Sequence, residues 1–152
     1  MAKYTTTAIR EETTKTQYAV SITGPAEAAA ILVDEMRKHD HQEGFYALTL
    51  NTKNSVTGLH LISLGSLNAS IVHPREIFFH AIGCKSCGRK SAASIILAHN
   101  HPSSSTEPSR EDIEFSKRFA KCGELIGIQL LDSLIIDTET GRFESLKEKG
   151  IF

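Results

Sequence analysis

The chain lacks tryptophan and has no long hydrophobic run. A membrane-spanning helix needs about 20 consecutive apolar residues, and no stretch of the 152 residues approaches that length. The cysteines number three, an odd count, and the N-terminal segment has no apolar core of the kind that a secretory signal carries. These absences predict a cytoplasmic protein that has no disulfide scaffold and does not bind a membrane.

The chain also has no large excess of charge of either sign, since it has 17 lysine and arginine residues and 18 acidic residues, and the formal net charge is −1. A domain that mainly grips nucleic-acid phosphates is usually basic, so strong direct binding of nucleic acid is not expected. Lys85, Arg89 and Lys90 form only a small basic cluster, which is more simply a solvated loop.

Cys84 and Cys87 form a CxxC pair, but only Cys122 remains to accompany them. A metal site built from cysteines needs a second pair. We therefore interpret the two as incidental thiols at a loop or helix end, with a redox pair as the minor alternative.

Alternating β-prone and amphipathic segments fill the rest of the chain. Apolar and β-branched runs predict strands, and Pro25 and Pro74 stand where a first helical turn tolerates proline. We expect helices over 25 to about 39, from 74, and over 110 to about 126. We expect strands over 17–23, on both sides of a turn at 51–54, and over 67–72, 94–98 and 128–136, followed by a short closing segment over 142–146. The pattern predicts one α/β or α+β domain over residues 17–152, after a polar, flexible arm of residues 1–16.

Two histidines end the buried run at 94–98. Alternation along a strand directs residues i and i+2 to the same side, about 6.5 Å apart, so His99 and His101 can converge on one point. Such a pair suits a tetrahedral zinc ion. On its own, however, a His-x-His pair is more often structural than metal-binding.

Ser109 and Asp112 have the spacing of a capping box, in which a serine caps a helix and an acidic residue three positions later bonds back. Asp112 also heads a stripe with steps of 3, 4, 3 and 4 that must face the core: Asp112, Phe115, Phe119, Cys122 and Ile126. An unpaired carboxylate in that position is costly, and a cation would remove the cost. Helix capping alone and metal ligation both stay open at this point.

The order His99, His101, seven residues, Ser109, two residues, Asp112 resembles the signature of the JAB/MPN (JAMM) metalloprotease superfamily. Its RadC-like branch is matched further by HNHPSS (99–104), PSRED (108–112), LLDSLII (130–136), HPRE (73–76) and LNTKN (50–54). The resemblance covers about residues 17–152, the MPN domain only. The N-terminal helical domain of longer relatives, which resembles a DNA-binding helix-hairpin-helix module, is not expected in this sequence.

The resemblance implies an MPN/JAB fold, a twisted mixed sheet flanked by helices that is similar to the cytidine deaminase layout. It also implies one zinc ion per chain, held by His99, His101 and Asp112 and completed by a water. Glu43 would accept the proton of that water, and Ser109 would stabilise the oxyanion. From the residues alone, Glu43 can equally be an exposed strand end, and it is no better a candidate than Glu76.

The implied function is a zinc-dependent metallopeptidase or isopeptidase that acts on a peptide or protein and is associated, through the family, with DNA repair. The alternative is a non-catalytic binding or scaffold module in DNA repair or recombination. The sequence leaves the substrate and the oligomeric state open.

The chain departs from the family pattern at two positions near these motifs. Ser104 replaces the glycine of HPSG, which removes a flexible joint, and Ser133 replaces the histidine of LLDHLII. Asn100 and residues 103–105 are predicted to do no more than form the loop and shape the cleft.

Overall fold

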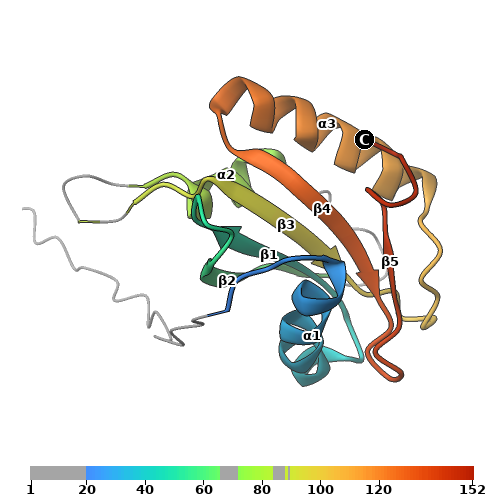
Figure 1. Ribbon diagram of the computed structural model, residues 1–152. Helices are drawn as coiled ribbons and strands as arrows, with labels where there is room; N and C mark the ends of the chain where they lie inside the picture. The colour runs from blue at the N-terminus through green and yellow to red at the C-terminus, as the bar shows by residue number, and fades with distance from the viewer. Residues whose placement is uncertain (1–19, 66–71, 84–87, 89) are drawn as a thin grey trace, which may run out of the picture.

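A computed structural model of the chain describes residues 20–65, 72–83, 88 and 90–152 (Figure 1). The predicted arm over 1–16, most of the strand expected at 67–72, and the CxxC pair lie outside these ranges. The elements are α1 (Pro25–Met36), the short 3-10 helix η1 (Arg37–His39), β1 (Glu43–Leu50), β2 (Val56–Gly65), α2 (Pro74–Ala81), β3 (Ser94–His99), α3 (Arg110–Ile126), β4 (Gln129–Ile136) and β5 (Phe143–Ser145).

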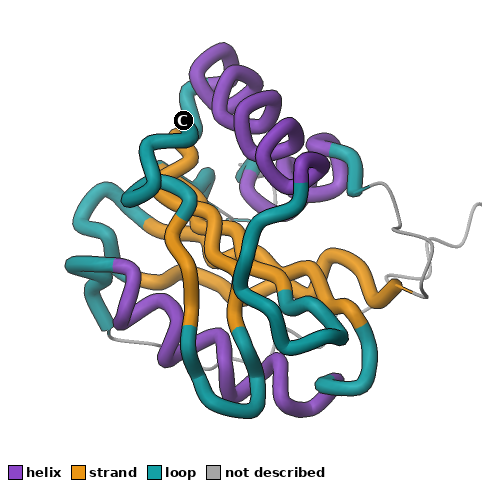
Figure 2. Tube along the Cα trace, turned by 90° about the vertical axis from the view of Figure 1, so that its right-hand side faces the viewer, coloured by secondary structure: helices purple, strands orange, loops and turns teal. Residues whose placement is uncertain are grey.

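The strands form one sheet in the order β2-β1-β3-β4-β5. β3 and β4 are parallel and are joined by α3, whereas each of the other neighbouring pairs is antiparallel. In Figures 1 and 2 the sheet is twisted and lies between α1 on one face and α2 and α3 on the other. The predicted α+β fold, a mixed sheet flanked by helices, is thereby confirmed.

The sheet separates two apolar cores because neighbouring residues of a strand point to opposite faces. On β1, Tyr46 and Leu48 belong to the core under α1, whereas Ala47 belongs to the core under α2 and α3. On β3, Ile96 faces α1 and Ile95 faces the other two helices. His99, four residues after Ile95, therefore lies on the α2–α3 face.

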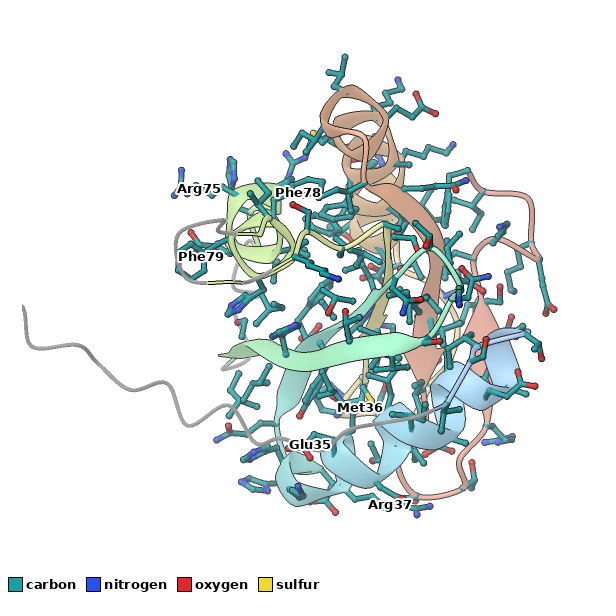
Figure 3. All side chains as sticks on the ribbon, turned by 60° about the vertical axis from the view of Figure 1, so that its left-hand side comes forward. Glu35, Met36, Arg37, Arg75, Phe78 and Phe79 are labelled. Carbon is teal, nitrogen blue, oxygen red and sulfur yellow. The ribbon has the colours of Figure 1, made fainter. Side chains whose placement is uncertain are left out.

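The helices cover these cores with few residues each. Met36 of α1 is fully buried against the sheet, and Phe78 of α2 stacks on Phe119 of α3 with ring centroids 4.7 Å apart. Phe79, the residue after Phe78 in α2, points away from the core and is 65% exposed (Figure 3). No helix in the described ranges is both long and apolar enough to cross a membrane.

The strand predicted over 17–23 is wrong for the described residues 20–23. They form an isolated bridge between Ser21 and Ser55, beside a hydrogen bond of 2.8 Å from the Ile22 N–H to the Asn54 carbonyl. Thr23-Gly24-Pro25 begins α1 directly afterwards, so the segment ends before a ladder can form.

The stripe predicted on α3 is right at its start and wrong at its end. Phe119 is fully buried, but Ile126 is 48% exposed, because the chain turns away at Gly127 in the left-handed conformation. The helix instead buries Gly123, whose missing side chain lets the helix backbone approach the start of β4.

We expect Gly123→Ala to lower the free energy of unfolding by about 1–3 kcal/mol through overpacking. A Cβ atom at this position would stand 2.4 Å from the Ile128 carbonyl oxygen, which belongs to the backbone and cannot rotate away. Urea unfolding followed by circular dichroism measures the change. The exposed substitution Lys121→Ala on the same helix is the control and should stay within about 0.5 kcal/mol of the wild type. Equal stability of both variants would contradict the packing argument.

Candidate metal centre

The candidate site lies at one edge of the sheet, where three elements meet. β3 ends at His99 and α3 begins at Arg110, so the loop between them crosses this edge. β1 runs antiparallel to β3, and its residue Phe45 pairs with His99, so the start of β1 lies at the same edge. Loops at the carboxyl ends of parallel strands are the usual place for ligand sites in such sheets.

The structure brings together the three side chains predicted as ligands. Nε2 of His99 lies 3.1 Å from Nε2 of His101 and 3.0 Å from Oδ1 of Asp112. Nε2 of His101 lies 3.2 Å from Oδ2 of Asp112. His99 is buried, and the other two side chains are partly buried, so the cluster is open to solvent on one side. The three residues are close enough to bind one metal ion.

Protons can satisfy two of these three contacts, because each imidazole can donate from Nε2 to its own oxygen of Asp112. The two Nε2 atoms would then lie side by side at 3.1 Å without a hydrogen bond between them. One cation between the three side chains can use both nitrogens and the carboxylate together. The edge of a tetrahedron with bonds of about 2.0–2.1 Å is about 3.3 Å long, close to these separations. The donor set and its spacing thus fit a tetrahedral metal.

The electrostatics of the cluster favour the ionised form of Asp112. Burial would raise the pKa of Asp112, but the hydrogen bonds from His101 and His99 outweigh burial and hold the pKa below its usual value. The hydrogen bond to Asp112 raises the pKa of His101, against the effect of burial, and the negative charge of Glu43 adds to the rise. Glu43 is the first residue of β1, two positions before Phe45, which pairs with His99.

The capping box is present, and it does not exclude metal binding. The Asp112 N–H donates to Oγ of Ser109 at 3.1 Å, and the Ser109 N–H donates to Oδ2 of Asp112 at 2.8 Å. Oδ1 of Asp112 faces His99, so the carboxylate serves the helix start and the histidines together. The two alternatives that the sequence leaves open for Asp112 are therefore compatible.

Phe45, which sequence reasoning missed, orients His99. The two rings stack with centroids 5.6 Å apart and an interplanar angle of 8°. Metal-bound histidines usually donate their second ring N–H to an acceptor, but Nδ1 of His99 is a buried atom without a hydrogen-bond partner among the described residues. The ring of Phe45 therefore orients the His99 imidazole by stacking on it. Alternation from Glu43 and pairing of β1 with β3 are the sequence features that could have indicated Phe45.

Asn100 is more than the loop former that the sequence predicts. It is 2% exposed, and its side chain accepts a hydrogen bond from the Gly44 N–H and donates one to the Gln42 carbonyl. A polar residue placed directly after a buried strand and between two ligands is the feature that could have drawn attention to it.

The two departures from the family pattern have different structural consequences. Ser104 adopts φ of 57°, the left-handed region that favours glycine, and its N–H bonds to the His101 carbonyl at 3.0 Å. The turn after His101 therefore keeps the shape that a glycine would take. Ser133 is buried and accepts a hydrogen bond of 3.1 Å from the Ser116 hydroxyl, so it contacts α3.

Ser104→Gly should leave the free energy of unfolding unchanged or raise it by up to about 1 kcal/mol, because glycine adopts a positive φ without a steric penalty. Ser103→Gly is the matched control, since the left-handed φ in this turn belongs to Ser104 and not to Ser103. Glycine there only adds entropy to the unfolded chain and should destabilise. Chemical denaturation of both variants measures the difference, and the opposite ranking would show that the turn is not held at position 104.

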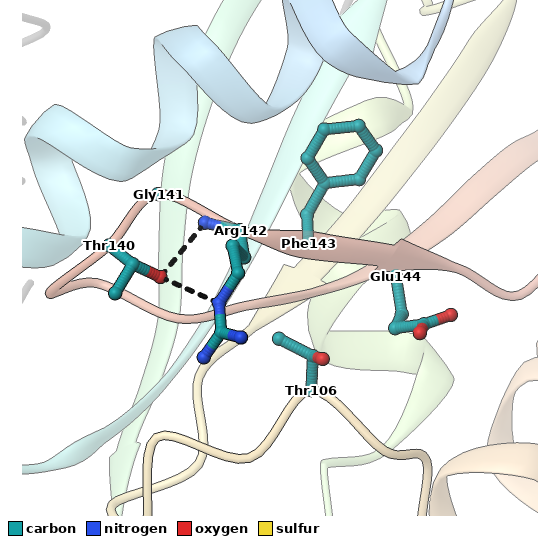
Figure 4. A pocket seen from close by; sticks show the side chains of 6 residues that line it. All are labelled: Thr106, Thr140, Gly141, Arg142, Phe143 and Glu144. Carbon is teal, nitrogen blue, oxygen red and sulfur yellow. Dashed lines mark hydrogen bonds between the residues drawn. The ribbon is translucent and has the colours of Figure 1, made fainter.

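A surface hollow of about 490 Å³ shares a wall with the ligand loop (Figure 4). Thr106 of the loop faces the β4–β5 hairpin, and the hollow is lined by Thr106, Thr140, Gly141, Arg142, Phe143 and Glu144. Arg142 is held in place by a hydrogen bond of 3.1 Å from its Nε to Oγ1 of Thr140. None of the three candidate ligands lines the hollow, but the hollow borders the loop between β3 and α3, which carries His101.

The mixed sheet, with two histidines and an aspartate at the β3–α3 junction, is consistent with a domain of the JAB/MPN class. The family model described as RadC-like JAB domain matches residues 22–151. The chain belongs to this RadC-like JAB domain family, as the resemblance of its motifs predicts.

Relatives of about 50% identity are named UPF0758 proteins. That of Clostridium kluyveri is 53% identical over 130 residues, which are 86% of this chain and 53% of that protein. That of Bacillus pumilus is 49% identical over 144 residues, 95% of this chain and 59% of that protein. That of Moorella thermoacetica is 49% identical over 130 residues, 86% of this chain and 53% of that protein. The chain spans about half the length of the curated relatives it matches, and their names state no activity.

If the cluster binds zinc, metal analysis of the purified protein should find one zinc per chain. His99→Ala and Asp112→Ala each remove one of three ligands and should reduce the content to a small fraction, as measured by atomic emission after dialysis. His73→Ala, an exposed histidine at the start of α2, is the control and should retain the metal. Wild-type protein without metal, or variants with unchanged content, would contradict the assignment.

Proposed function

We propose that the domain is a zinc-dependent hydrolase that cleaves an amide bond, in a peptide or in an isopeptide linkage. The observation that carries the proposal is the cluster of His99, His101 and Asp112, whose ligand atoms lie 3.0–3.2 Å apart, a spacing that suits one tetrahedral cation. Membership of a family related to metalloproteases supports the same class of reaction.

His99, His101 and Asp112 would hold the zinc, and three protein ligands leave a fourth position for water or substrate. When bound, zinc lowers the pKa of a water to about 7 and polarises the carbonyl of the amide. The donor set supports zinc rather than magnesium or calcium, which prefer sites built of oxygen ligands alone.

Glu43 is our proposed general base. It starts β1 at the edge where the ligands lie, and its charge acts on His101. Its carboxylate would take a proton from the attacking water and hand it to the leaving nitrogen. Glu76, the rival candidate from the sequence, lies at the exposed start of α2 beside Arg75.

Ser109 would donate a hydrogen bond from its hydroxyl to the developing oxyanion. Its Oγ already accepts the N–H of Asp112, and an accepting hydroxyl keeps its own hydrogen free to donate. Where measured, one such donor contributes about 10²–10³-fold to the rate. Capping and oxyanion stabilisation can therefore use one serine without conflict.

The alternative of a non-catalytic DNA-repair module has no observation in its favour. The net charge of −1 offers no basic footprint, and the relatives' names mention neither DNA nor repair. The association with DNA repair stays a prediction from the resemblance.

Glu43→Gln tests the proposal. The zinc-loaded wild type is expected to cleave members of a fluorogenic peptide library or of a lysine ε-amide series, read by fluorescence and mass spectrometry. Glu43→Gln should retain zinc and lose about 10²–10⁴-fold in kcat, because a positioned base contributes that much. Glu76→Gln is the matched control and should keep full activity.

Full activity in Glu43→Gln would refute the base assignment. Hydrolysis by the metal-free protein, equal to that of the zinc-loaded protein, would refute the proposed mechanism as a whole.

A further inference from the structure

We propose that Asn100 is a positioning residue that fixes the general base relative to the metal ligands. This inference rests on the proposed function, because it concerns the distance between Glu43 and the pair His99 and His101. Asn100 stands between the two histidines in the chain, yet its side chain reaches across to the other strand.

The side chain of Asn100 bonds to β1 directly beyond the point where the backbone pairing of β1 with β3 ends. The last pair of β1 and β3 is Phe45 with His99, and the next pair in register would be Gly44 with Asn100. In its place, the Gly44 N–H donates to Oδ1 of Asn100 at 2.9 Å, and Nδ2 of Asn100 donates to the Gln42 carbonyl at 3.0 Å. A carboxamide offers one acceptor and an N–H donor, as a peptide group does. The amide thus substitutes for a strand residue.

These two hydrogen bonds flank Glu43. Its predecessor Gln42 and its successor Gly44 are both tied to Asn100, so the backbone of Glu43 is held from both sides. Alternation places the Glu43 side chain on the face of Phe45, which is the face of His99. The two hydrogen bonds of Asn100 therefore fix the position of Glu43 relative to the strand that carries His99.

Before the Phe45–His99 pair, no other hydrogen bond in the described part of the chain joins residues 42–44 to the strand that carries His99. Glu43 also pairs with Gly65, but Gly65 is the last residue of β2, on the far side from β3. Asn100 is only 2% exposed, and its Oδ1 and Nδ2 both bond to the backbone beside Glu43, so it is not placed to contact a substrate. We therefore assign its effect on the reaction to the position of Glu43.

A matched control exists at the other end of the same strand. Oδ1 of Asn51 accepts the N–H groups of Lys53 at 2.9 Å and of Ser55 at 3.0 Å, directly after β1 ends at Leu50. Asn51→Ala, like Asn100→Ala, removes two hydrogen bonds between an asparagine side chain and the backbone, although Asn51 accepts both of its bonds. The Asn51→Ala substitution changes nothing at the end of the sheet where the candidate metal ligands lie.

The test is a double-mutant cycle of Asn100→Ala with Glu43→Gln, with zinc content and urea unfolding measured for every variant. Hydrolysis of the best substrate from the library gives kcat and KM. Acetohydroxamic acid is a second probe that needs no turnover, since it chelates zinc through two oxygens and gives its proton to a nearby base. Its affinity for the zinc-loaded protein is measured by calorimetric titration.

Asn100→Ala should keep zinc, lower kcat by about 10–100-fold with little change in KM, and weaken hydroxamate binding, because the base is displaced. In the Glu43→Gln background the same substitution should have no further effect on either readout. Asn51→Ala should lower stability comparably and leave kcat unchanged. Asn100→Asp keeps the acceptor for Gly44 but loses the donor for Gln42, and it should fall between Asn100→Ala and the wild type.

Equal losses from Asn100→Ala in the wild-type and Glu43→Gln backgrounds would overturn the inference while leaving the proposed function intact. If Asn100→Ala does not fold, Asn100→Asp enters the same cycle with the same criteria. A wild-type protein that binds zinc but cleaves no substrate refutes the proposed hydrolase, and the hydroxamate cycle then decides the positioning of Glu43 by itself. Wild-type protein that binds no zinc would overturn both.

Discussion

The antiparallel pairing of β1 with β3 is the interaction on which the candidate site depends. It brings the first residue of β1 to the edge where β3 delivers its histidines, although more than fifty residues separate Glu43 from His99 in the chain. The crossover through α3 then returns Asp112 to the same edge, since a helix that follows a parallel strand starts where that strand ends. The order and direction of the strands therefore place Glu43, His99 and Asp112 at the same end of the sheet.

The fold was largely predictable because its elements are locally consistent. The helix over 110–126 has a serine cap at its start and a glycine at its end, and the buried run at 94–98 admits little other than a strand. Residues 20–23 were misjudged as a strand because β-propensity does not show how soon the next helix begins, and here α1 starts before more than one bridge can form. Ile126 was misjudged because helical periodicity does not register the close approach at Gly123 that sets which face is buried.

The ligands could be proposed from the sequence because all three belong to one continuous motif with fixed spacing. Glu43, Phe45 and Asn100 could not be assigned from local pattern, since their positions depend on the register between two distant strands. Register is a long-range property, and a shift by one residue would send Glu43 to the opposite face of the sheet. Glu43 was identified through the family resemblance, whereas Phe45 and Asn100 were identified only in the structure.

The two apolar cores have a consequence for a metal ion that the cluster could hold. They enclose the sheet from both faces without using any of the three candidate ligands, so the domain has a core of its own that does not depend on an ion. In small zinc modules the ion is the core, and its removal unfolds the chain. Here the candidate ligand atoms already lie 3.0–3.2 Å apart, held by a strand end and a capped helix. An ion bound by them would enter a scaffold that is already folded, so its occupancy would follow the metal supply.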